Sequence, residues 1–71
     1  MNVLDLHGKK HEKVEVEVEN FILLEDMPVK IITGNSMVML NITISVLDKH
    51  GLLWDYETHF NLGAIVVIDP T

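Results

Sequence analysis

The sequence predicts an α/β (α+β) domain built as a two-layer sandwich, with two helices on a four-stranded mixed sheet. The chain has 71 residues, enough for one domain, and 48% of them are hydrophobic, which excludes a disordered tail. Segments of strand character alternate with segments of helical period in the order strand, helix, strand, helix, strand, strand. No segment is repetitive or of low complexity, so residues 1–71 are expected to form a single domain.

The first strand is predicted over residues 2–6, where apolar residues recur and Gly8 follows as a turn residue. The next segment is ambiguous, because Val and Glu alternate over residues 14–19 as they would in a strand. A stripe of helical period continues beyond this alternation, and a strand of that length is unusual, so a helix over residues 10–25 is favoured. The stripe consists of Val14, Val18, Phe21, Ile22 and Glu25.

The second strand is predicted over residues 29–32, after Pro28 has ended the helix. A cluster of turn and helix-cap residues follows at positions 33–36. The second helix is expected to end near His50, because Gly51 suits the position after a helix C-terminus. Its predicted apolar stripe consists of Met37, Leu40, Ile44 and Leu47.

The last two strands are predicted over residues 53–58, which alternate, and 64–68, which form a continuous apolar run. Residues 60–63 form the turn between them. Trp54 and Tyr56 fall on one face of the earlier strand. Such a pair usually packs in a core or a dimer interface, and less often it stacks on nucleobases.

The net charge of the chain argues against a broad nucleic-acid-binding surface. Eleven acidic residues against five basic ones give a formal charge of −6, whereas domains that bind phosphates concentrate Lys and Arg on one face. A local basic patch remains at Lys9, Lys10 and Lys13, and solvated surface is the alternative interpretation of it.

The absence of cysteine excludes disulfides and thiolate zinc sites, so a metal would need His and carboxylate ligands. The apolar runs are far shorter than the roughly 20 residues of a membrane span. The N-terminus also lacks a basic segment followed by an apolar one. We therefore expect a cytoplasmic protein that does not enter a membrane. Because so small a domain buries a limited share of its surface, a homodimer and a protein partner both stay open.

Two predicted loops are expected to meet at one edge of the sheet. A strand, helix, strand connection joins parallel strands, so the loops after the first two strands leave the same edge. Each loop precedes a helix, whose first turn has free N–H groups and a partial positive charge, and glycines let an anion approach the backbone. The edge is therefore a predicted phosphate site, although the glycines could be simple turn residues and Ser36 a helix cap. The candidate residues are Asp5, His7 and Gly8 in the first loop and Thr33, Gly34, Asn35 and Ser36 in the second.

The segment LDLHG at residues 4–8, the following helix with Glu12, and IITG at residues 31–34 resemble the small MutS-related (Smr) domain. The closing residues 63–67 are similar to the last strand of that family, and the resemblance covers nearly the whole chain. It implies a fold similar to the C-terminal domain of a bacterial translation initiation factor. It also implies an activity that nicks DNA or cleaves RNA, although some relatives bind nucleic acid without clear catalysis.

The resemblance carries the acidic and histidine positions of the family signature over to Asp5 and His7. It carries the family's Thr-Gly-X-Gly loop over to Thr33 and Gly34. Ser36 stands where that loop has its second glycine, and basic residues often found around the loop are missing here.

These residues suggest phosphodiester hydrolysis, and the resemblance implies that it would be the activity of an endonuclease or nickase. Imidazole exchanges protons near neutral pH, so His7 is a candidate general acid or base, and Asp5 could orient its ring or bind a divalent metal such as magnesium or manganese. Alternatively, both residues are structural: Asp5 caps the turn, and His7 donates a hydrogen bond that holds the loop. The residues expected to hold the phosphate are Gly8, Lys9, Lys10, Thr33, Gly34, Asn35 and Ser36. A different class of function, a non-catalytic nucleic-acid-binding or protein-interaction module, is favoured by the negative charge.

Overall fold

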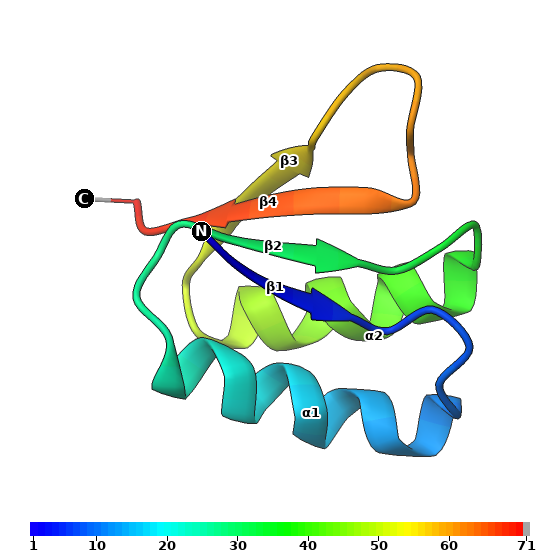
Figure 1. Cartoon of the computed structure of the whole chain (residues 1–71). Helices are drawn as coiled ribbons and strands as arrows, with labels where there is room; N and C mark the ends of the chain where they lie inside the picture. Colours follow the sequence, from blue (N-terminus) through cyan, green and yellow to red (C-terminus); the bar gives the residue numbers. More distant parts are fainter. Residues whose placement is uncertain (71) are drawn as a thin grey trace.

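The computed structural model describes residues 1–70 of the chain, so residue 71 of the predicted domain lies outside the described residues. The order of strands and helices agrees with the sequence prediction (Figure 1). The elements are β1 (Asn2–Asp5), α1 (His11–Leu24), β2 (Val29–Ile32), α2 (Met37–Lys49), β3 (Leu53–Tyr56) and β4 (Ala64–Ile68).

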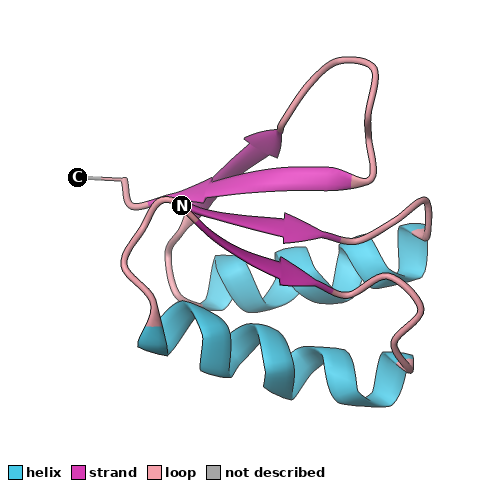
Figure 2. Ribbon diagram, viewed as in Figure 1, coloured by secondary structure: helices cyan, strands magenta, loops and turns pink. Residues whose placement is uncertain are grey.

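The four strands form one mixed sheet in the order β1-β2-β4-β3. β1 and β2 are parallel, and β4 is antiparallel to both β2 and β3. Both helices lie on the same side of this sheet, which leaves its other side uncovered (Figure 2). The predicted two-layer α+β sandwich is therefore confirmed, including the parallel pairing of the first two strands.

The ambiguous Val/Glu segment is a helix, as predicted. The residues that α1 buries are Val14, Val18 and Ile22, which follow one another at intervals of four, whereas Val16 between them is 61% exposed. The helix is one residue shorter at each end than predicted, because Lys10 and Glu25 have extended backbone angles and act as its caps.

The buried face of α2 differs from the predicted stripe. Met37 is 65% exposed, so its place in the stripe was wrong, whereas Ile44 is partly buried and packs against the core. Thr43 is fully buried instead, because its hydroxyl donates a hydrogen bond to the carbonyl oxygen of Met39 at 2.9 Å and thus leaves no unsatisfied polar group. The residues that α2 buries are Met39, Leu40, Thr43, Val46 and Leu47.

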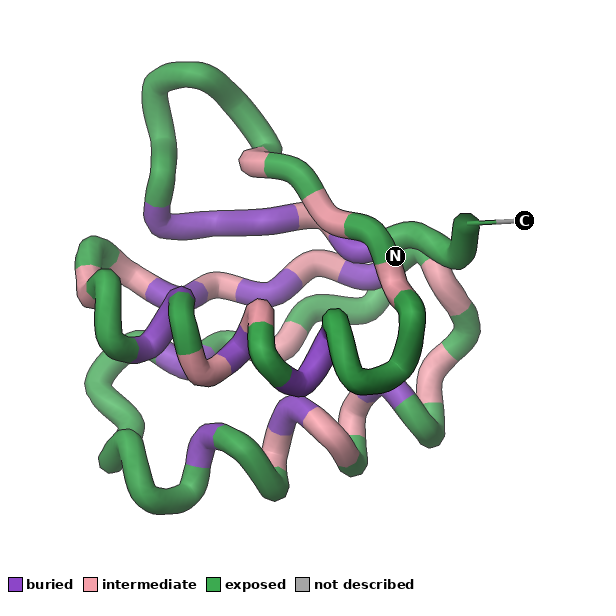
Figure 3. Tube along the Cα trace, turned by 180° about the vertical axis from the view of Figure 1, so that it is seen from behind, coloured by how far each residue is buried: buried purple, intermediate pink, exposed green. Residues whose placement is uncertain are grey.

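The core lies between the helices and the covered side of the sheet (Figure 3). Alternate strand residues point into it, among them Ile31 on β2 and Ile65 on β4, which pair across the two strands and are both fully buried. Trp54 and Tyr56 pack against this core as partly buried residues, with ring centroids 5.4 Å apart at an interplanar angle of 89°. Core packing, the commoner of their predicted roles, is therefore the observed one.

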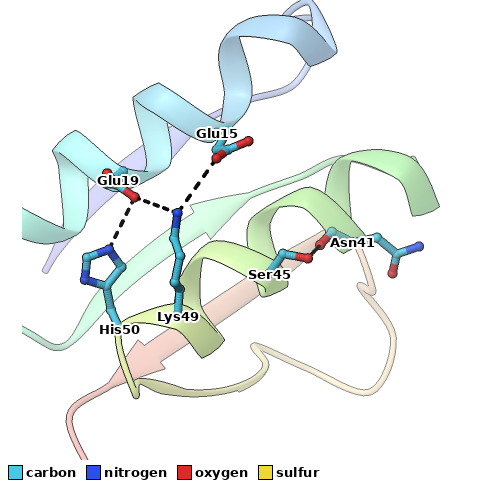
Figure 4. A network of polar contacts seen from close by, with 6 residues as sticks. All are labelled: Glu15, Glu19, Asn41, Ser45, Lys49 and His50. Atoms are coloured by element: carbon cyan, nitrogen blue, oxygen red, sulfur yellow. Dashed lines mark hydrogen bonds and ion pairs between the residues drawn. The ribbon is translucent and has the colours of Figure 1, made fainter.

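Polar contacts join the outer faces of the two helices (Figure 4). Oε2 of Glu19 on α1 lies 3.2 Å from Nζ of Lys49 and 3.4 Å from Nε2 of His50 at the end of α2. The hydrogen bond with His50, followed by those with Lys49 and its charge, lowers the pKa of Glu19 below its ordinary value of 4.5. Glu15 contributes a longer contact to Lys49, at 3.8 Å.

Neither helix within residues 1–70 has the length and the apolar run that crossing a membrane requires.

Candidate functional site

The first two strands end side by side, as their predicted parallel pairing requires. Asp5, the last residue of β1, is opposite Ile32, the last residue of β2. The backbone N–H of Leu6 donates to the carbonyl oxygen of Ile32 at 2.8 Å, which extends the pairing one residue beyond the strands. The first loop (residues 6–10) and the second loop (residues 33–36) therefore leave the same edge of the sheet (Figure 1).

The first loop is a tight turn that holds His7 at the surface. Oδ1 of Asp5 accepts a hydrogen bond from the backbone N–H of His7 at 2.9 Å. The N–H of Lys9 donates to the carbonyl oxygen of Leu6 at 3.0 Å, and Gly8 adopts a φ of 79°, which favours glycine. Asp5 thus caps this turn, one of the two roles that the sequence left open, and Leu6 is buried while His7 is exposed.

The side chain of His7 lies against the second loop. Its Cδ2 atom is 3.4 Å from the point where a Cβ at Gly34 would stand, and Gly34 itself has a φ of 68°. The two loops that the sequence predicted to converge therefore lie side by side at this pair of residues. The imidazole remains open to solvent, so a ligand that reaches this edge can meet it.

A third segment, which the sequence did not bring to this edge, holds the second loop in place. Because β4 runs antiparallel beside β2, the residue before it, Gly63, lies next to the end of β2. The backbone N–H groups of Thr33 and Gly34 both donate to the carbonyl oxygen of Gly63, at 2.8 and 3.0 Å. A Cβ at Gly63 would be 3.1 Å from backbone atoms of Gly34, so glycine is needed there for close packing.

Two of the residues predicted to bind phosphate therefore serve the loop itself. Thr33 is 2% exposed, and its hydroxyl lies within hydrogen-bonding distance of the carbonyl oxygens of Gly34 and Gly63, at 3.2 and 3.4 Å. The N–H of Gly34 is bonded to Gly63, as described above. Thr33 and Gly34 thus fix the shape of the second loop, and Asn35 is the exposed residue at its end.

Ser36 caps the second helix. Its hydroxyl oxygen accepts a hydrogen bond from the backbone N–H of Met39 at 3.1 Å, the geometry of an N-cap. The cap role that the sequence offered as the alternative for Ser36 is thus the one observed. The start of α2 keeps further first-turn N–H groups at the same edge as His7.

The lysines near the first loop are not equivalent. Nζ of Lys9 forms an ion pair with Oε1 of Glu17 at 2.9 Å, so part of its charge is neutralised within the protein. Within residues 1–70, Lys10 and Lys13 take part in no ion pair. Lys10 is also the N-cap residue of α1, and it lines an open surface depression of about 560 Å³ together with Lys9, His11 and Glu12. The charge of the basic patch that is not neutralised by an ion pair therefore lies on Lys10 and Lys13.

A groove lies beside the second loop, between the start of α2 and the sheet. It has a volume of about 180 Å³. Sequence reasoning missed it, because its wall at Leu62 comes from the segment before β4, whose position depends on β4 pairing with β2. The residues that line the groove are Gly34, Asn35, Ser36, Met37, Leu40, Tyr56 and Leu62.

Among residues 1–70, no three or more His, Cys, Asp or Glu side chains are grouped so that they could hold a metal ion. The chain matches no family model, no curated protein and no solved structure. Function is therefore inferred from the residues at this edge, their contacts and the motif that contains them.

Proposed function

We propose that this domain is an Smr-like nucleic-acid-processing domain that cleaves phosphodiester bonds, nicking DNA or cleaving RNA. The observation that supports this most is the position of the exposed His7 imidazole beside Gly34, because it brings the two motif segments together at one edge. The absence of cysteine agrees with a place in the reducing cytoplasm.

In the proposed reaction His7 is the general acid. Water attacks the phosphorus atom, the bond from phosphorus to the leaving oxygen breaks, and the protonated imidazole donates its proton to that oxygen. The proton lost by the attacking water passes to solvent. Asp5 is a positioning residue in this scheme, since its carboxylate holds the backbone N–H of His7 and so fixes the turn that presents the imidazole.

The phosphate is held by groups that this edge leaves open. These are the first-turn N–H groups of the two helices, which carry a partial positive charge, and the ammonium groups of Lys10 and Lys13. Gly8 lets the backbone of the first loop approach the ligand, and Asn35 offers an amide at the exposed end of the second. A divalent cation such as magnesium or manganese would add charge stabilisation of the transition state when bound.

The test is incubation of the purified domain with supercoiled plasmid and with a labelled structured RNA, at low salt, with and without magnesium or manganese. We expect nicking or cleavage that is lost in His7→Ala. His50→Ala is the matched control, because it removes an exposed histidine at the far end of α2. Cleavage that persists in His7→Ala, with both variants folded, would contradict the proposal.

The second candidate is a non-catalytic nucleic-acid-binding or protein-interaction module. It is favoured by the net charge of −6 and by the pairing of Lys9 with Glu17, which leaves little free positive charge to neutralise phosphates. A salt-dependent gel shift without cleavage, in the same experiment, would select nucleic-acid binding. The absence of both would direct the search to a protein partner or to a homodimer.

A further inference from the structure

We infer that the groove beside the second loop is a subsite for one base of an unpaired nucleotide, which makes single-stranded DNA or RNA, or an unpaired loop of either, the substrate class. This inference rests on the proposed function, because it places the base next to the loop that holds the phosphate. The shared chemistry of the ligand is a planar base attached to a sugar phosphate.

The size of the groove fits one ring. Its volume is about 180 Å³. An apolar protein cavity of about 150 Å³ accommodates a benzene molecule, whereas pockets for larger organic ligands begin at about 300 Å³. The groove therefore has room for a single base-sized ring.

The lining of the groove offers both surfaces that a base requires. Tyr56 contributes an aromatic ring, and Leu40 and Leu62 contribute apolar walls, which suit the faces of a base. Asn35 and Ser36 contribute an amide and a hydroxyl, which can form hydrogen bonds with the polar edge of a base. A purely apolar peptide side chain would leave these polar groups unused.

Gly34 connects the groove with the proposed catalytic residue. It lines the groove, and the imidazole of His7 lies beside it, 3.4 Å from the position of a Cβ there. A base in the groove therefore brings its own sugar phosphate toward His7. In a duplex the bases are stacked and paired, so a base can enter such a groove only from a single strand or after it has been flipped out.

Exposed apolar side chains continue the surface at the same edge. Phe60 in the segment before β4 is 98% exposed, and Met37 and Val38 at the start of α2 are 65% and 53% exposed. Exposed aromatic and apolar groups next to a nucleic-acid site give neighbouring unpaired bases a surface on which to stack.

The test compares the binding of fluorescently labelled strands to the whole domain at low salt. The probes are oligothymidine, oligouridine, an abasic strand of the same length, and a duplex of the oligothymidine with its complementary strand. The abasic strand carries the same phosphate charge without bases, so we expect it and the duplex to bind more weakly by a factor of about five or more. The oligothymidine and oligouridine arms distinguish DNA from RNA as the source of the nucleotide.

The variant that tests the groove is Tyr56→Leu, which removes the ring from its wall. Trp54→Leu is the matched control, because it breaks the same ring pair, on the same face of β3, without changing a residue that lines the groove. Of these two variants, we expect only Tyr56→Leu to lower the affinity for oligothymidine relative to that for the abasic strand. If Tyr56→Leu does not fold, amide NMR shifts of Gly34 and Leu62 during titration of the unmodified domain with oligothymidine decide the matter.

Equal affinity for the normal and abasic strands, or unchanged NMR shifts at the groove, would overturn the base subsite. The proposed cleavage would stand in that case if plasmid or RNA were still cut in a manner that depends on His7. Base-dependent binding that Tyr56→Leu abolishes, without any cleavage, would support the subsite and contradict the catalytic role of His7.

Discussion

The imidazole of His7 lies beside Gly34, with Cδ2 3.4 Å from the position of a Cβ at that glycine. The loop after β1 thus lies next to the loop after β2 at this pair of residues. A side chain at position 34 would therefore meet the imidazole of the proposed general acid.

Gly34→Ala should place a methyl group in van der Waals contact with the imidazole of His7, and Gly51→Ala provides the matched control. Both glycines have a φ of 68°, so alanine at either position should lower the free energy of unfolding by about 1–2 kcal/mol. A Cβ at Gly51 meets nothing within 4 Å, whereas a Cβ at Gly34 meets His7. Urea unfolding should show similar losses of the free energy of unfolding for both variants. Only Gly34→Ala should shift the ring resonances of His7, and unchanged resonances would contradict the position of the imidazole beside Gly34.

Asp5→Ala should destabilise the first turn, and Asp5→Asn should preserve it. The amide oxygen of asparagine can still accept the hydrogen bond from the N–H of His7, whereas alanine loses it at a cost of about 0.5–1.5 kcal/mol. We expect cleavage to fall in Asp5→Ala and to be largely retained in Asp5→Asn, measured beside urea unfolding curves. If Asp5→Asn is stable but inactive, the charge of the carboxylate is needed, as in metal binding.

Glu17→Gln should strengthen the binding of nucleic acid. The substitution releases Lys9 from its ion pair, so the slope of log affinity against log salt should steepen by about one unit. Glu15→Gln is the matched control, because it changes the net charge by the same amount but removes only the 3.8 Å contact with Lys49. Its slope of log affinity against log salt should therefore match that of the unmodified protein. Equal slopes for the two variants would show that Lys9 does not contact phosphate.

Ser36→Gly should be tolerated and Ser36→Ala should not. The hydroxyl of Ser36 caps α2 through the N–H of Met39, and the loss of such a cap to alanine costs about 1 kcal/mol, whereas glycine at an N-cap costs only a few tenths. Ser36→Gly also restores the second glycine of the motif that the loop resembles. Chemical denaturation of both variants measures the difference, and equal losses would mean that the cap contributes little.

Protonation of Glu19 at acid pH should lower the free energy of unfolding. The pKa of Glu19 is lowered in the folded protein, chiefly by the hydrogen bond with His50. Its stabilising contribution is therefore fully present above pH 4.5, the ordinary value, and is lost as the pH falls through the lower folded pKa. The free energy of unfolding, measured at a series of decreasing pH values, should decrease less steeply for Glu19→Gln than for the unmodified protein. His50→Ala should show an intermediate slope. Identical slopes in all three proteins would contradict this role of Glu19.

The fold could be predicted because local patterns agree with it along most of the chain. The spacing of Val14, Val18 and Ile22 outweighed the Val/Glu alternation, which exposes Val16 on the opposite face of α1. In α2 nearly every face is apolar, so periodicity could not identify the buried one, and the hydrogen bond of Thr43 that permits its burial is not a feature of composition.

The candidate site could be predicted only in part. The meeting of the first and second loops followed from the parallel pairing of their strands. The contribution of Gly63 and Leu62 depends on β4 entering the sheet next to β2, which is a long-range pairing without a local signal. The ion pair of Lys9 with Glu17 was likewise missed, because Lys9 precedes the helix and lies outside the spacing of neighbours on a helix face.

The position of β4 between β2 and β3 makes the formation of the site inseparable from the closure of the sheet. Gly63 accepts the hydrogen bonds of Thr33 and Gly34 only when β4 is docked, and β3 has no other strand to pair with. A folding intermediate that contains β1, α1 and β2 would therefore have both motif segments but not the second loop in its final shape. The proposed activity would then be present only in fully folded chains, and partly folded chains would lack it.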